Sequence, residues 1–82
     1  MEVLYERCCG LDVHKKEVVA CVITPMGKET KSFATMTDDL LRLADWLASQ
    51  QVTHIAMEST GPYWKPIYNL LETEFALVLG NA

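Results

Sequence analysis

The chain has 82 residues, of which 50% are apolar, and a net charge of −4 at pH 7. This length allows one small domain at most, and the apolar content is enough for a core, which excludes a disordered tail. The seven lysines and arginines form no basic stripe, so composition argues against a free-standing nucleic-acid-binding module.

The first half of the chain is predicted to form three strands. The first covers residues 7–13, and the second, which is rich in β-branched residues, covers residues 17–24. Proline and glycine within residues 24–27 suit a type I turn. A third strand over residues 29–36 should therefore return antiparallel to the second.

The second half alternates helices with strands. A helix is predicted over residues 37–49, with its first threonine as N-cap and apolar residues at spacings of three and four. A fourth strand over residues 52–57 follows, then a helix over residues 62–71 capped by Thr60, and a fifth strand over residues 75–79.

This order of elements, an antiparallel meander followed by parallel crossovers, is that of the α/β ribonuclease H-like folds. We therefore predict a mixed sheet of five strands with two helices. On that fold the first and fourth strands are neighbours in the centre of the sheet, so their carboxyl ends meet at one edge.

Two carboxylates stand where these two strands end, Asp12 in the first apolar run and Glu58 directly after the fourth. Parallel neighbours lie about 4.8 Å apart, so the two acids would repel unless a proton or a cation intervenes. Alternation places them on the face of Gly10 and Ala56, whose small size allows a close approach. We predict a partly buried pair that is catalytic and binds Mg²⁺ or Mn²⁺, the metals of phosphodiester chemistry.

Five residues near the acids are candidates for contact with nucleic acid. His14 shares the face of Asp12 and could assist a metal or a phosphate, or bond to the backbone. Lys15 is a phosphate ligand or a solvated charge, and Tyr63 and Lys65 could contact a nucleobase. Thr60 belongs to a helix-capping sequence whose free N–H groups also suit a phosphate.

The blocks at residues 10–15 and 57–64, in this order and spacing, resemble the start of the transposases of the insertion-sequence family one-ten. The resemblance implies a RuvC-like DEDD catalytic domain of a bacterial DNA transposase or recombinase, with DNA and a guide RNA as partners. Matched residue by residue, Asp12 is the first acid of the tetrad and Glu58 the second. The other two acids lie, in family members, beyond the point where this chain ends.

The same resemblance implies that residues 1–82 are the N-terminal part of the catalytic domain and hold half of an active site. We expect this piece alone to be inactive. We also expect a homo-oligomer, because the acid-bearing face and the edge at residues 75–79 would otherwise be exposed.

Two alternatives stay open. In an actin-like ATPase or sugar kinase the first hairpin would cradle phosphate, although small residues normally follow the acid where Val13 and His14 stand here. A non-catalytic ribonuclease H-like interaction module is the other.

Composition also bears on location and redox state. The longest uninterrupted apolar run, residues 18–23, is too short to cross a bilayer, and Glu2 and Glu6 disfavour a signal peptide, so we expect a cytoplasmic protein. The three cysteines fit neither a zinc site nor a disulfide framework, and we expect reduced core thiols.

Overall fold

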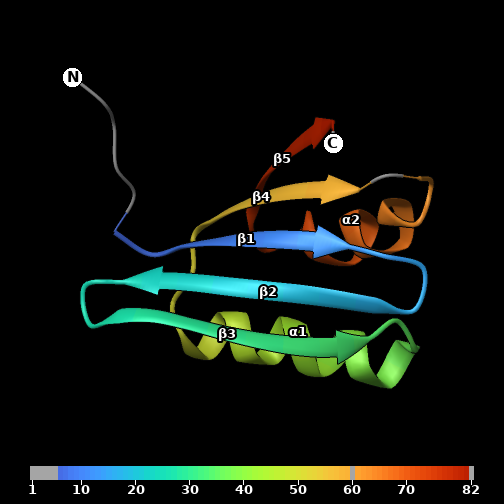
Figure 1. Cartoon of the computed structure of the whole chain (residues 1–82). Coiled ribbons are helices and arrows are strands. Elements are labelled where there is room, and N and C mark those ends of the chain that lie inside the picture. Colours follow the sequence, from blue (N-terminus) through green and yellow to red (C-terminus); the bar gives the residue numbers. More distant parts are fainter. Residues whose placement is uncertain (1–5, 60, 82) are drawn as a thin grey trace.

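A computed structural model of the chain describes residues 6–59 and 61–81. The elements in chain order are β1 (Cys8–Val13), β2 (Glu17–Thr24), β3 (Gly27–Ala34), α1 (Thr37–Ser49), β4 (His54–Ser59), α2 (Trp64–Leu71) and β5 (Ala76–Asn81). The strands form one sheet in the order β3-β2-β1-β4-β5, and both helices lie on one side of it (Figure 1). Strand β1 pairs antiparallel with β2 and parallel with β4. The predicted α/β ribonuclease H-like fold is confirmed.

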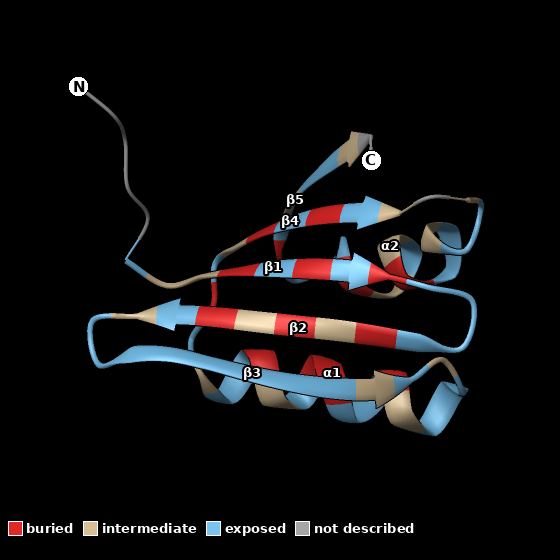
Figure 2. Cartoon of the chain, viewed as in Figure 1, coloured by how far each residue is buried: buried red, intermediate tan, exposed pale blue. Residues whose placement is uncertain are grey.

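The core lies between the sheet and the helices. Successive strand residues point to opposite faces, and Figure 2 shows the resulting alternation of buried and exposed bands along β1 and β4. The predicted apolar face of α1 is the face that is buried, and α2 adds two fully covered side chains. The buried helix residues are Leu40, Leu43, Ala44, Leu47, Ile67 and Leu71.

The turn between β2 and β3 lies at the predicted residues, 24–27, but β3 begins directly at its end. Thr24 pairs directly with Gly27, so only two residues make the turn, and β3 begins at Gly27 and ends at Ala34. The hydroxyl of Thr24 accepts a hydrogen bond from the N–H of Met26 at 3.1 Å. Gly27 has φ +131°, a conformation that favours glycine. Strand β3 therefore begins and ends two residues earlier than the predicted third strand over residues 29–36.

Strands β4 and β5, by contrast, begin later than predicted, because the residues before them form the ends of the preceding helices. The N–H of Val52 donates to the carbonyl of Leu47 at 3.1 Å, and the N–H of Phe75 donates to the carbonyl of Leu71 at 3.1 Å. These bonds close α1 and α2 before β4 and β5 start. Strand β4 also ends later than predicted, because its pairing with β1 and β5 continues to Ser59, so Glu58 lies within the strand and not after it.

The predicted helix caps differ from those observed. Helix α1 has Met36 as its N-cap, in extended conformation and without a capping side-chain hydrogen bond, so Thr37 is the first helical residue. Helix α2 begins at Trp64, with Tyr63 as its N-cap, and residues 61–63 precede it as a bend and turn. The predicted cap Thr60 lies outside the described residues.

The cysteines are free thiols, as predicted, but only one belongs to the core. Cys9 faces the helices with 3% of its surface exposed, and burial raises the pKa of its thiol to about 12. Cys8 and Cys21 are half-buried on the opposite face of the sheet. The prediction that all three are core thiols was wrong for these two, because strand alternation turns them away from the helices.

Candidate metal centre

The parallel register of β1 and β4 places Asp12 directly beside Glu58. Each acid is the last residue but one of its strand, so both stand near the carboxyl end of the sheet. Neighbouring strands lie about 4.8 Å apart, and partners in register point to the same face. The predicted juxtaposition of the two acids is therefore present in the structure.

The acids border a hollow of about 260 Å³ on the face of the sheet that carries no helix. Small residues keep this face open. A Cβ atom added at Gly10 would meet nothing within 4 Å, and one added at Gly80 would lie 3.8 Å from the Glu58 Cγ. The residues that line the hollow are Gly10, Leu11, Asp12, Val19, Cys21, Ala56 and Glu58.

Sequence reasoning named Gly10 and Ala56 for this face but missed Val19 and Cys21 of β2 and Gly80 of β5. The antiparallel register that sets Asp12 opposite Val19 and Gly10 opposite Cys21 would have found the first two. The third follows from the parallel register of β4 and β5, which sets Gly80 beside Glu58.

The two acids are more exposed than predicted. The Asp12 side chain has 62% of its surface accessible, and Glu58 is also exposed. The expectation of a partly buried pair was wrong, because both helices cover the other face of the sheet. Water therefore screens the repulsion between the two carboxylates.

His14 contacts the first acid. Its Nε2 lies 3.0 Å from Asp12 Oδ2, and its backbone N–H donates to the carbonyl of Glu17 at 2.8 Å. The ring thus bonds to the acid and not to the backbone. This contact occupies one carboxylate oxygen and leaves the other with lone pairs for a further ligand.

The other candidates for nucleic-acid contact divide into three groups. Lys15 and Tyr63 line one hollow, which lies at the start of α2. Lys65 does not line this hollow, and its Nζ lies 5.9 Å from the centre of the Trp64 ring. Thr60 lies outside the described residues.

The family model of the IS110-type DEDD transposases, described as a transposase, matches residues 9–80. The chain belongs to this family. The match extends from β1 to β5 and includes both Asp12 and Glu58. A comparison with curated proteins finds no match. Membership implies DNA as the partner of this transposase chain, and it supports the transposase interpretation over the actin-like ATPase or sugar-kinase alternative.

DEDD transposases work with divalent metal ions, and the donors here fit such an ion in part. Two carboxylates from adjacent strands offer hard oxygen ligands, and Mg²⁺ is often held by one or two carboxylates together with substrate phosphates and water. Within residues 6–59 and 61–81, no group of three or more histidine, cysteine or acidic side chains could hold a metal. The pair of acids therefore suits a metal whose further ligands come from other sources.

In the described part of the chain, no helix is both long enough and apolar enough to cross a bilayer.

Proposed function

We propose that residues 1–82 are the N-terminal part of a RuvC-like DEDD catalytic domain that serves metal-dependent phosphodiester cleavage and strand transfer. The proposal rests on one observation, the register pairing of Asp12 with Glu58 in a chain of a transposase family. Two acids that share a sheet edge have no evident structural task, since both are exposed and neither contributes to the core.

In this proposal Asp12 and Glu58 hold Mg²⁺ or Mn²⁺. When bound, the metal supplies Lewis-acid polarisation of the phosphodiester. The chain's own residues do the rest of the work at this edge. His14 restrains the Asp12 carboxylate through the 3.0 Å contact, and Gly10 and Gly80 leave space in which a sugar–phosphate backbone can approach the acids.

Two acids are too few for the complete chemistry. A site with two metal ions about 3.5 to 4 Å apart needs more ligands than one aspartate and one glutamate provide. We therefore propose that the 82-residue chain alone is inactive and that additional acids of the transposase complete the site.

Transposition in cells tests the proposed roles. We expect Asp12→Asn and Glu58→Gln, introduced into the transposase that contains this chain, each to reduce transposition to background. The matched control is Asp45→Asn, which removes an exposed acid of α1. Transposition at the normal frequency in either active-site variant would overturn the proposal.

Nicking of supercoiled plasmid by the purified 82-residue chain tests the half-site. We expect no nicking in Mg²⁺ or Mn²⁺. Mn²⁺-dependent nicking that Asp12→Asn abolishes would show that the two acids suffice, contrary to the proposal.

We also propose that two copies associate through the outer edge of β5. In the described part of the chain β5 pairs with β4 alone, and its Val78 and Leu79 are 66% and 39% exposed. An edge of this kind pairs readily with another strand. Light scattering should show a dimer at tens of micromolar, and Val78→Lys should shift it to a monomer, whereas a monomeric wild type would contradict the proposal.

A guide RNA is proposed as a second nucleic-acid partner on the strength of family membership. Binding of labelled RNA and DNA oligonucleotides to the transposase that contains this chain tests it. Failure of every RNA to bind more tightly than DNA of the same sequence would count against a guide.

A further inference from the structure

A second hollow, of about 260 Å³, lies between three segments that are distant in the sequence. These are the β1–β2 turn, the connection from β3 to α1, and the first turn of α2. Two of the residues around it, Leu40 and Ile67, are also buried in the core between the sheet and the helices. The lining residues are Lys15, Thr35, Leu40, Pro62, Tyr63, Pro66 and Ile67.

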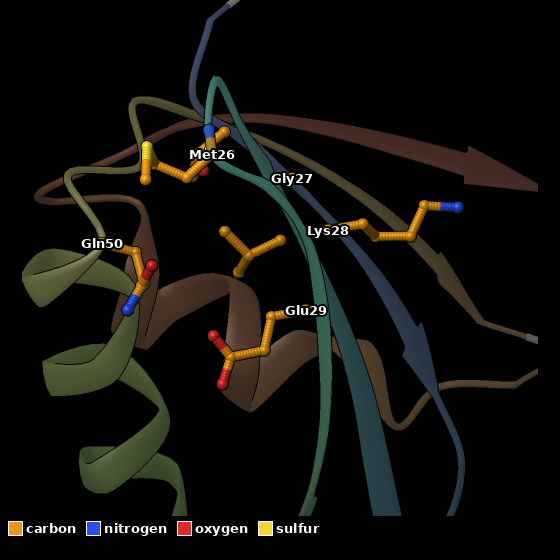
Figure 3. A pocket seen from close by; sticks show the side chains of 7 residues that line it. Met26, Gly27, Lys28, Glu29 and Gln50 are labelled. Atoms are coloured by element: carbon orange, nitrogen blue, oxygen red, sulfur yellow. Dashed lines mark hydrogen bonds between the residues drawn. The ribbon is translucent and has the colours of Figure 1, made fainter.

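The chemistry of this lining is unlike that of the other hollows. Two prolines and two buried apolar side chains line most of it. Tyr63, a residue with 41% of its surface exposed, adds an aromatic ring, and the exposed Lys15 adds a positive charge. A hollow of about 120 Å³ at the far end of the β2–β3 hairpin has no aromatic residue and includes the carboxylate of Glu29 (Figure 3). An apolar slot with an aromatic ring and a cation is the combination that binds an unpaired base and its phosphate.

We propose that this hollow, with Tyr63 and Lys15, binds one unpaired nucleobase of the nucleic-acid strand that passes the acids. The base stacks on the Tyr63 ring, and the Lys15 ammonium contacts an adjacent phosphate. This inference rests on the proposed function for the position of the strand, and it adds a nucleotide subsite on the opposite side of the sheet edge from the acids.

The tyrosine ring is held in a defined place. A Cβ atom added at Gly61 would lie 3.2 Å from Tyr63 Cε2, so the ring lies against bare glycine backbone. The hydroxyl of Ser59 accepts from the Gly61 N–H at 3.3 Å and donates to the Gly61 carbonyl at 3.0 Å. These hydrogen bonds hold the Gly61 backbone in place, and the Tyr63 ring packs against that backbone.

The lysine is anchored through its backbone. The Thr35 hydroxyl donates to the Lys15 carbonyl at 3.0 Å, which ties the β1–β2 turn to the segment that follows β3. Two acids, Asp38 and Asp39, lie in the first turn of α1, next in sequence to Leu40. Asp39 is paired with Arg42 at 2.6 Å, and this ion pair offsets the charge of Asp39 alone.

The hollow lies within reach of a strand bound at the acids. Lys15 follows Asp12 by three residues and Tyr63 follows Glu58 by five. Extended chain covers at most about 3.6 Å per residue, which limits these separations to roughly 11 and 18 Å. At about 3.4 Å per nucleotide of one strand, the stacked base lies within roughly five nucleotides of the phosphate at the acids.

Binding of oligonucleotides in EDTA to the transposase that contains this chain tests the subsite independently of metal chemistry. The probes are labelled single strands of DNA and RNA of one sequence, with an abasic position moved along each. We expect Tyr63→Leu to weaken binding at least about fivefold and Tyr63→Phe to retain it, because stacking needs the ring and not the hydroxyl. Lys15→Gln should lower the slope of binding affinity against salt concentration by about one phosphate contact. The control is Lys28→Gln, at the hollow of Figure 3, which should leave the dependence of binding on the abasic position unchanged.

The decisive comparison combines Tyr63→Leu with the abasic probes. At one abasic position the wild type should lose as much affinity as Tyr63→Leu causes on the intact strand. Tyr63→Leu and that abasic position together should cost no more affinity than either alone. Gly61→Ala, which displaces the ring but keeps it, should give an intermediate loss. Tighter binding of RNA or of DNA identifies the source of the base. Wild-type affinity of Tyr63→Leu, additive effects, or no binding of either strand would overturn the subsite, while loss of transposition in Asp12→Asn would still support the metal proposal.

Discussion

Replacement of Glu58 by glutamine should stabilise the protein when no metal is present. Glu58 stands beside Asp12 in a parallel register and both side chains are exposed. Two unit charges about 5 to 6 Å apart in a water-like dielectric repel by roughly 0.7 to 0.8 kcal/mol, and like charges beside each other on neighbouring strands are destabilising. We expect Glu58→Gln to raise the free energy of unfolding by about 0.5 kcal/mol, with the Asp12–His14 contact intact.

Urea unfolding in EDTA at low salt measures this change. A cycle of Glu58→Gln, Asp12→Asn and the double variant isolates the coupling between the two acids from the loss of the His14 contact. High salt should reduce the gain, because it screens exposed charges. Asp45→Asn is the control for a general effect of net charge.

Magnesium should reverse the order of stabilities. An ion that binds only the folded state stabilises it in proportion to the logarithm of one plus its concentration over its dissociation constant. Saturating Mg²⁺ should therefore stabilise the wild type and leave Glu58→Gln almost unchanged. Zero coupling in EDTA, or a lower stability of Glu58→Gln in EDTA, would refute the picture of two repelling carboxylates that a cation relieves.

Three further predictions concern the scaffold. Gly10→Ala should stabilise the fold by about 0.5 kcal/mol, because an added Cβ meets nothing and alanine loses less backbone entropy than glycine; calorimetric melting checks this, and destabilisation would contradict it. Leu43→Ala should cost about 2 to 5 kcal/mol, whereas Leu41→Ala, at a residue 47% exposed, should cost far less in the same urea titration. Burial raises the Cys9 pKa from 9.0 to about 12, so above pH 9 the unfolded state loses a proton that the folded state keeps, and stability should fall between pH 9 and 12; Cys9→Ala should flatten that fall, and an unchanged slope would contradict it.

The fold was predictable because local signals agree with one another. The β-branched residues of β2 and the proline and glycine of the turn predicted the hairpin, and β2 has the predicted bounds, Glu17–Thr24. The apolar spacing that begins at Leu40 predicted the buried face of α1. Element order then placed β1 beside β4, and the juxtaposition of Asp12 and Glu58 followed from that topology.

Features set by long-range contacts were not predictable. Threonine is favoured at N-caps, so Thr37 was predicted there, yet Met36 is the N-cap and makes no capping side-chain hydrogen bond. The acid-bearing face was expected to be exposed, but the accessibility of each carboxylate on it depends on the surrounding side chains, so the expected partial burial of the pair was wrong. The second hollow needs three loops to converge, and although Lys15 and Tyr63 were each candidates, nothing in the sequence brought them to one site.

The location of bound Mn²⁺ tests the central claim most directly. Paramagnetic broadening of backbone amide signals marks residues near the ion, and substoichiometric Mn²⁺ should broaden the amides around Asp12, Glu58 and Gly80 first. Asp12→Asn should abolish that pattern while the Asp45→Asn control retains it. Broadening centred on the acids of α1, or none near the ends of β1 and β4, would contradict the claim that Asp12 and Glu58 together hold the metal.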